Sequence, residues 1–108
     1  MNESEFHQAV DAVLDAIEGC IEESGAPIDC ELAGGILTIE FADGSKVIVN
    51  RQTANREIWV AARSGGFHFR HIDGAWRDTR SAQTLDALLS HVVSAQSGSG
   101  IAVTTSRR

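Results

Sequence analysis

The first 25 residues carry apolar side chains at the spacing of one face of an α-helix. Successive apolar positions are four, three, four and four residues apart: Phe6, Val10, Val13, Ile17 and Ile21. Asn2 is suited to cap this helix, and Glu5, three residues later, completes a capping box. Gly25 and Pro27 interrupt the pattern. The sequence therefore predicts a helix over residues 3–23.

Shorter segments with the alternation and composition of β-strands follow this helix. They cover residues 28–32, 36–41, 46–50, 57–63, 67–71 and 75–78. Residue pairs typical of tight turns separate most of them: Gly34-Gly35, Asp43-Gly44, Gly65-Gly66 and Asp73-Gly74. Because tight turns join neighbouring antiparallel strands, we predict a meander of five or six strands.

A second helix is predicted towards the C-terminal end. Its apolar face consists of Leu85, Leu88, Leu89 and Val92. Ser81 is the expected N-cap, and the helix is expected to end near Gln96. The last residues are rich in Ser, Gly and Thr and have no packed face of their own. We therefore expect one domain over residues 1–96 and a flexible tail, loose or partly docked, over residues 97–108.

The order of the elements, with a helix at each end of a run of strands, defines an α+β fold. Each helix has one apolar stripe, which must be covered by a sheet face. The simplest arrangement packs both helices on the same face of the antiparallel sheet, as a two-layer α/β sandwich. The opposite face then meets solvent, and Trp59 is the large side chain that could lie on it.

The charged residues divide the chain into an acidic and a basic part. Residues 1–45 contain eleven acids and neither Lys nor Arg, whereas residues 46–108 hold all nine basic residues and only four acids. The net charge of −6 therefore understates the charge of the first part. Such a surface attracts cations or basic partners and repels nucleic acid, so no nucleic-acid partner is expected.

Much of this acidity falls on the polar face of the first predicted helix. The acids at helical spacing are Asp11, Asp15, Glu18 and Glu22. The stripe could be extended by Glu3, His7, Glu23, Asp29 and Glu31. Like charges at this spacing cost a helix about 0.2–0.5 kcal/mol per pair, and no Lys or Arg of the helix offsets that cost.

Clustered carboxylates favour hard cations, and His7 adds a borderline ligand. Because the ligands would lie on a convex helix face, coordination would be incomplete and weak. Two interpretations stay open from the residues alone. The stripe is either a surface for a cation or a basic partner, or a solvated acidic face without a specific ligand.

Other chemistry receives little support. The chain has no apolar run of about 18 residues that could cross a membrane, and no phosphate-binding loop, nucleophile elbow or zinc-protease motif. Cys20 and Cys30 lack the spacing of a zinc site, and we interpret them as free, mostly buried thiols. The acidic N-terminus lacks the features of a signal peptide. We therefore expect a cytoplasmic protein with no membrane partner.

Several segments occur in an order and spacing typical of one known family. They are Ser4-Glu5-Phe6-His7, Asp29-Cys30-Glu31, Gly34-Gly35-Ile36-Leu37-Thr38-Ile39, Asp43-Gly44-Ser45-Lys46-Val47-Ile48-Val49-Asn50-Arg51-Gln52, Ile58-Trp59-Val60-Ala61 and Gly65-Gly66-Phe67-His68-Phe69. On these residues the chain resembles the frataxin family over about residues 3–96, and most closely its bacterial branch, the CyaY proteins. The resemblance implies the same two-layer fold.

The resemblance also implies a function that is not enzymatic. The family binds ferrous and ferric iron weakly at an exposed acidic ridge and docks on the cysteine desulfurase and the scaffold protein of iron–sulfur cluster assembly. No organic cofactor is implied. Together with His7, the metal-binding positions are Asp11, Glu18, Glu22, Glu23, Asp29 and Glu31. The partner-binding positions, on the sheet surface, are Asn50, Arg51, Gln52 and Trp59.

Two departures from the family pattern lower the expected number of iron sites. Gly19 stands where a carboxylate is usual, and the connection Ser24-Gly25-Ala26-Pro27 is short and neutral. Two alternatives stay open: a ferroxidase that stores oxidised iron, and an acidic protein-binding module that needs no metal. We expect a monomer, with iron-dependent oligomers as an open alternative. The sequence does not indicate whether the desulfurase would be inhibited or stimulated.

Overall fold

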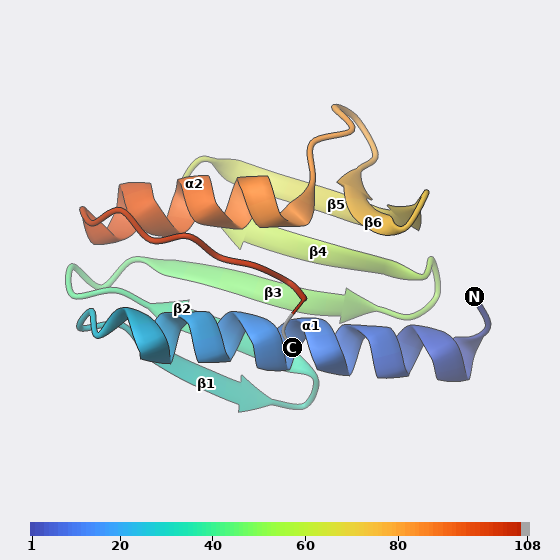
Figure 1. The fold of residues 1–108 in the computed structure, drawn as a ribbon, viewed down its shortest axis with the longest axis horizontal. Coiled ribbons are helices and arrows are strands. Elements are labelled where there is room, and N and C mark those ends of the chain that lie inside the picture. Colours follow the sequence, from blue (N-terminus) through green and yellow to red (C-terminus); the bar gives the residue numbers. More distant parts are fainter. Residues whose placement is uncertain (107–108) are drawn as a thin grey trace.

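The computed structural model describes residues 1–106, which form a six-stranded sheet and two helices (Figure 1). The elements in chain order are α1 (Glu3–Ser24), β1 (Asp29–Ala33), β2 (Ile36–Glu40), β3 (Lys46–Gln52), β4 (Glu57–Ala62), β5 (Gly65–Ile72), β6 (Ala75–Asp78) and α2 (Leu85–Ser97). The strands lie in the order of the sequence, and all neighbours are antiparallel. The predicted α+β meander is confirmed, with six strands.

Helix α1 begins where the sequence predicts it. The side chain of Asn2 accepts a hydrogen bond from the backbone N–H of Glu5, and the Glu5 carboxylate accepts one from the N–H of Asn2, both at 2.8 Å. The capping box therefore satisfies two N–H groups that the helix leaves without partners. Gly25 ends the helix in the left-handed conformation, with φ of 70°, and donates to the carbonyl of Glu22.

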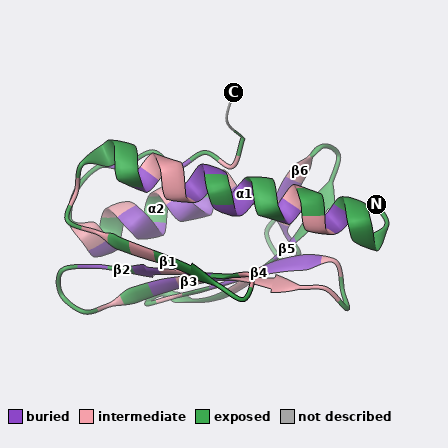
Figure 2. Cartoon of the chain, turned by 90° about the horizontal axis from the view of Figure 1, so that it is seen from below, coloured by how far each residue is buried: buried purple, intermediate pink, exposed green. Residues whose placement is uncertain are grey.

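Both helices cover one face of the sheet, and the other face carries no helix (Figure 2). We call the latter the open face. Side chains alternate between the two faces along each strand. Val47 and Val49 of β3 point towards the helices and are fully buried, as are Ile58 and Val60 of β4. The core lies between this covered face and the apolar stripes of α1 and α2. Neither helix is long and apolar enough to cross a membrane, among the residues that the structure describes.

Helix α2 begins later than predicted. The N-cap is Thr84 and not Ser81: the Thr84 hydroxyl accepts a hydrogen bond from the N–H of Ala87 at 3.2 Å. The hydroxyl of Ser81 instead accepts from the N–H of Gln83, within the preceding turn. Both Ser and Thr can cap a helix. Thr84 does so here because it directly precedes Leu85, the first residue of α2, whose side chain is buried in the core.

Residues 99–106 form a C-terminal segment that runs between α1 and α2 (Figure 1). The tail was expected to be loose or partly docked, without a packed face of its own; the structure docks it through Ile101 and Val103, which are 8% and 2% exposed. The core therefore extends beyond residue 96, where the sequence predicted the domain to end. Residues 107–108 of the predicted tail lie outside the described residues.

Hydrogen bonds attach this segment to α2 at regular intervals. Ser94 and Ser90 each bond the N–H and the carbonyl of one residue, Ile101 and Val103 respectively, over 2.8–3.2 Å. Thr105 donates to the carboxylate of Asp86 through its N–H and its hydroxyl. Four helical residues rise about 6 Å and two extended residues span about 6.6 Å. Alternate residues of the segment therefore meet successive turns of α2.

Candidate functional site

The predicted stripe of carboxylates lies on the outer side of α1, and two further acids lie on β1. We call the following set the acidic ridge: Asp11, Asp15, Glu18, Glu22, Glu23, Asp29 and Glu31. All are exposed except Glu18, which is half-buried. Leu14 and Ile17, on the opposite side of α1, are buried in the core and hold the ridge outward.

The alternation of β1 divides the ridge into two parts. Leu32 is the register partner of the buried Leu37, and Cys30 is the partner of the buried Ile39, so both point to the face covered by α1. Asp29 and Glu31 therefore point to the open face. The structure does not bring all predicted metal ligands to one side.

Cys30 lies where α1 and β1 meet, among the ridge carboxylates. It is half-buried and packs against the core. Burial, followed by the negative charges of Glu18, Glu22 and Asp29, raises the pKa of the Cys30 thiol to about 11. The three carboxylates are therefore close enough to act on one atom. The sequence signal for this environment is the position of Cys30 between two acids, Asp29 and Glu31.

The ridge does not form a closed metal site. Among residues 1–106, no three His, Cys, Asp or Glu side chains converge closely enough to hold a metal ion. A cation on the ridge would therefore take one or two protein oxygens and complete its shell with water. Hard cations accept such ligands at low affinity.

Arg51 lies at the end of the ridge nearest the N-terminus of α1, which we call the upper end; the end around Glu18, Glu22 and Glu23 is the lower end. Its Nη2 donates to Asp11 Oδ1 at 2.5 Å, and its Nη1 lies 2.8 Å from Nδ1 of His7. The Arg51 side chain is only 17% exposed. Two predicted metal ligands, His7 and Asp11, are thus already engaged by a cation of the protein itself.

The assignment of Arg51 to the sheet surface together with Asn50, Gln52 and Trp59 is wrong. Arg51 follows Val47 and Val49 at even spacing on β3, so it points to the covered face, whereas Asn50 and Gln52 point to the open face. A one-residue step along a strand reverses the face of a side chain. Of the four predicted partner-binding residues, Asn50, Gln52 and Trp59 lie on the open face.

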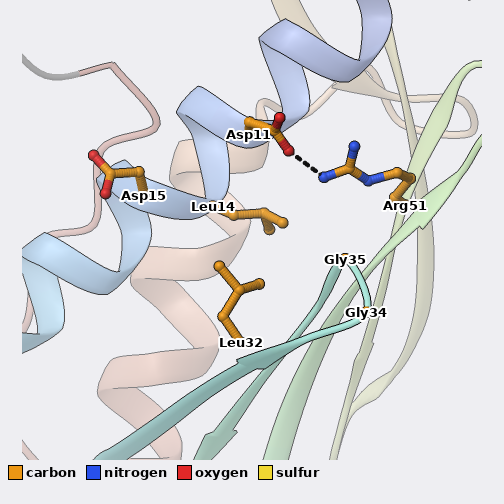
Figure 3. Close-up of a pocket in the computed structure, with 7 residues that line it drawn as sticks. All are labelled: Asp11, Leu14, Asp15, Leu32, Gly34, Gly35 and Arg51. Carbon is orange, nitrogen blue, oxygen red and sulfur yellow. Dashed lines mark hydrogen bonds and ion pairs between the residues drawn. The ribbon is translucent and has the colours of Figure 1, made fainter.

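A cavity of about 560 Å³ lies between α1 and the turn that joins β1 to β2 (Figure 3). Leu14 and Leu32 face each other across it, with Asp11, Asp15 and Arg51 at its rim. Gly35, at φ of 77°, lets the chain pass close to Arg51, because a Cβ there would come within 3.1 Å of Arg51 Nε. This turn thus shapes the position from which Arg51 reaches α1.

On the open face, one row of register partners crosses three strands: Asn50 of β3, Trp59 of β4 and His68 of β5. The Trp59 and His68 rings stack, with centroids 4.3 Å apart and planes at 11°. Trp59 is half-buried and His68 is exposed. The open face therefore presents an aromatic pair at its centre.

Glu57 is buried on this open face, at 5% exposure, and is not among the residues predicted from the sequence. Its register partners are Gln52 and Arg70. Trp59 Nε1 donates to Oε1 of Glu57 at 2.8 Å, and Arg70 Nη2 donates to Oε2 at 2.6 Å. The signal that could have found it is the spacing Glu57–Trp59, which places both side chains on one face of a strand.

Residues 1–99 match the family model of the frataxin-like domain. The iron–sulfur cluster assembly protein CyaY of Vibrio cholerae is 53% identical over 89 residues, which cover 82% of this chain and 86% of that protein. The protein of the same name from Paraburkholderia phymatum is 45% identical over 103 residues, 95% of this chain and 98% of that protein.

Solved structures give the same result. Frataxin from Psychromonas ingrahamii superposes with a TM-score of 0.88 at 37% identity, covering 99% of this chain and 100% of that one. Trimeric frataxin from the yeast Saccharomyces cerevisiae, complexed with ferrous iron, superposes with a TM-score of 0.74 at 29% identity, covering 83% of this chain and 86% of that one.

Proposed function

Because the chain belongs to the frataxin family, we propose that it is an adaptor of iron–sulfur cluster assembly. It binds iron as cargo at the acidic ridge, docks on the cysteine desulfurase and the scaffold protein, and catalyses no reaction itself. It acts in the cytoplasm, where its two free cysteines stay reduced. Support comes from the relatives named as assembly proteins and from the yeast frataxin complexed with ferrous iron.

The observation that carries the proposal is the run of carboxylates at the junction of α1 and β1, where Glu18 and Glu22 lie on the helix and Asp29 lies on the strand. Their charges act together on one thiol, so they create a local negative potential at the junction of α1 and β1. No Lys or Arg precedes Lys46 in the sequence to neutralise it. A divalent or trivalent cation gains most at this junction, since Arg51 already neutralises the upper end of the ridge.

The same potential favours a basic partner surface, and we assign it to the desulfurase. Electrostatic docking of this kind speeds association and weakens with salt. The open face is the separate docking surface for the scaffold protein, with Asn50, Gln52 and Trp59 as its central residues. Trp is among the residues that contribute most to protein interfaces.

A two-dimensional NMR titration tests these assignments. Anaerobic ferrous iron is expected to broaden the amide signals of residues 15–31 and to leave those of β4 and β5 unchanged. The desulfurase is then expected to shift the same ridge signals, and the scaffold protein to shift Asn50 and Trp59. Changes scattered over the whole chain, or confined to the open face on addition of iron, would contradict the proposal.

A further inference from the structure

Glu57 is an unusual residue for its place in the fold. It lies on the face that neither helix covers, and yet it is only 5% exposed. Its cover comes from neighbours on the open face itself: Trp59 two residues along β4, Gln52 across on β3 and Arg70 across on β5. A buried carboxylate is costly unless it is paired and hydrogen-bonded. The contacts made by Glu57 therefore indicate its role.

Both oxygens of Glu57 accept a hydrogen bond from a specific donor. Oε1 accepts from the Trp59 indole and Oε2 from the Arg70 guanidinium, at 2.8 and 2.6 Å. Burial alone would raise the pKa of Glu57, but these hydrogen bonds and the charges of Arg70 and His68 hold it below its ordinary value. The carboxylate is thus a permanent acceptor for the indole N–H.

This network fixes Trp59 from two directions. The N–H edge of the indole is held by Glu57, and one face of the ring is stacked on His68 at 4.3 Å. The two restraints together leave the side chain little freedom to change rotamer. Side chains that are already ordered lose less entropy when a partner docks on them.

The network also determines which chemistry Trp59 offers to a partner. Its only hydrogen-bond donor is already used within the chain. What remains for contact is aromatic carbon. Beside it, Arg77 and Arg70 are register partners on the open face, and the Glu57 carboxylate is bonded to Arg70. The complementary surface is therefore apolar opposite Trp59 and acidic opposite Arg77.

We propose that Glu57 is a positioning residue, which holds Trp59 in the orientation required for docking the scaffold protein. The surface of the scaffold protein that meets Trp59 is apolar, and an acidic side chain of the scaffold protein flanks it. This inference rests on the proposed function, because it assumes that the open face receives the scaffold. Glu57 itself stays beneath the interface and acts only through Trp59 and Arg70.

The test compares Glu57→Met, which fills the space but removes the acceptor, with Glu57→Gln, which keeps an oxygen for the indole. We expect Glu57→Met to shift the Trp59 Nε1–H signal and speed its hydrogen exchange, and to weaken binding of the scaffold protein about tenfold. Glu57→Gln is expected to restore the signal and most of the affinity. If Glu57→Met does not fold, Glu57→Ala replaces it.

Trp59→Ala separates this inference from the proposed function. If Trp59→Ala weakens scaffold binding and Glu57→Met does not, the open face is the docking surface but the role of Glu57 is overturned. If Trp59→Ala leaves scaffold binding unchanged, the docking assignment fails and the inference fails with it. An equal loss in Glu57→Met and Glu57→Gln would also overturn the inference, since only one of them lacks the acceptor.

Discussion

Arg51 of β3 and Asp11 of α1 form an ion pair at 2.5 Å, with the guanidinium largely buried and the carboxylate exposed. The same guanidinium lies 2.8 Å from the ring of His7. The residue expected to meet a partner on the sheet therefore engages two of the residues expected to bind metal, and it neutralises one of them, Asp11. Glu18 and Glu22 lie at the opposite end of the acidic ridge.

The first prediction concerns Arg51→Met. The change removes the ion pair but keeps much of the apolar stem that packs over the turn at Gly35, so the fold should persist. We expect a loss of about 1–2 kcal/mol in the free energy of unfolding, measured by urea denaturation. Ferrous iron should bind more tightly in anaerobic calorimetry, because His7 and Asp11 become available.

Arg56→Met is the matched control for that change. Arg56→Met removes the same charge; the Arg56 guanidinium lies 3.9 Å from Glu3 and donates one hydrogen bond to the carbonyl of Thr53. The change should lower the free energy of unfolding by about 0.5–1 kcal/mol, less than Arg51→Met. Equal iron affinity in the Arg51→Met chain and the unmodified chain would mean that the upper ridge contributes nothing to iron binding.

The second prediction concerns the lower ridge. In Glu18→Gln/Glu22→Gln/Glu23→Gln, iron and desulfurase binding should weaken together. The fold should gain about 1 kcal/mol, because like charges and acids at a helix C-terminus are both unfavourable. Calorimetric binding and thermal denaturation measure the two effects.

A charge-matched pair tests whether position matters for this effect. Glu22→Gln and Asp73→Asn remove one negative charge each, but Asp73 lies in the turn between β5 and β6. Asn tolerates the positive φ of 52° at that position. Binding should fall in Glu22→Gln and stay unchanged in Asp73→Asn. Stability falling sharply in the triple variant while iron binding persists would contradict the assignment of the ridge.

The third prediction concerns the C-terminal segment. Val103→Ala removes two methyl groups from a side chain that is 2% exposed, and should cost about 1–3 kcal/mol. Ala102→Ser, at the exposed neighbouring position, should cost less than about 0.5 kcal/mol. Equal denaturation midpoints for the two variants would mean that the segment does not contribute to the core.

The fourth prediction concerns the ionisation of Cys30. Its folded pKa of about 11 exceeds the ordinary value of 9.0, so the folded chain keeps the thiol protonated where the unfolded chain loses its proton. The resulting stability is present below about pH 9 and is lost as the pH rises towards 11. In a Cys20→Ser background, the pH–rate profile of alkylation should have its midpoint near 11.

Neutralising the ridge should move that midpoint. Glu18→Gln/Glu22→Gln removes two of the charges that disfavour the thiolate, so the alkylation midpoint should fall towards that of an ordinary thiol. Burial, the larger cause, remains and keeps the midpoint above 9.0. An unchanged midpoint in the double variant would place these carboxylates away from the thiol.

The repeating elements of the fold follow from local patterns. The helical spacing of the inner face of α1 and the Asn2/Glu5 capping box predict its start correctly. The turn pairs Gly34-Gly35 and Asp73-Gly74 have positive φ at both residues, as two-residue hairpin turns require. Each of these signals depends only on residues a few positions apart.

The errors concern residues whose role depends on distant partners. Arg51 is polar in an otherwise apolar row of β3, and only His7 and Asp11, on the first helix, make that position favourable. The burial of Ile101 and Val103 depends on Ser90 and Ser94 of α2, whose hydroxyls bond their backbone. Composition alone predicted a flexible tail there, because a segment rich in Ser, Gly and Thr has no apolar face that would indicate packing.

The position of the C-terminal segment also determines when the core can be completed during synthesis. As the chain leaves the ribosome, each strand can pair with the one made just before it, and contacts between sequence neighbours form quickly. The space between the helices stays open until Ile101 and Val103 follow α2. A nascent chain that stops before residue 101 would therefore expose apolar surface on an otherwise formed domain. Chaperones and proteases recognise such surfaces, so we expect a chain that lacks these last core residues to be removed more readily than the complete one.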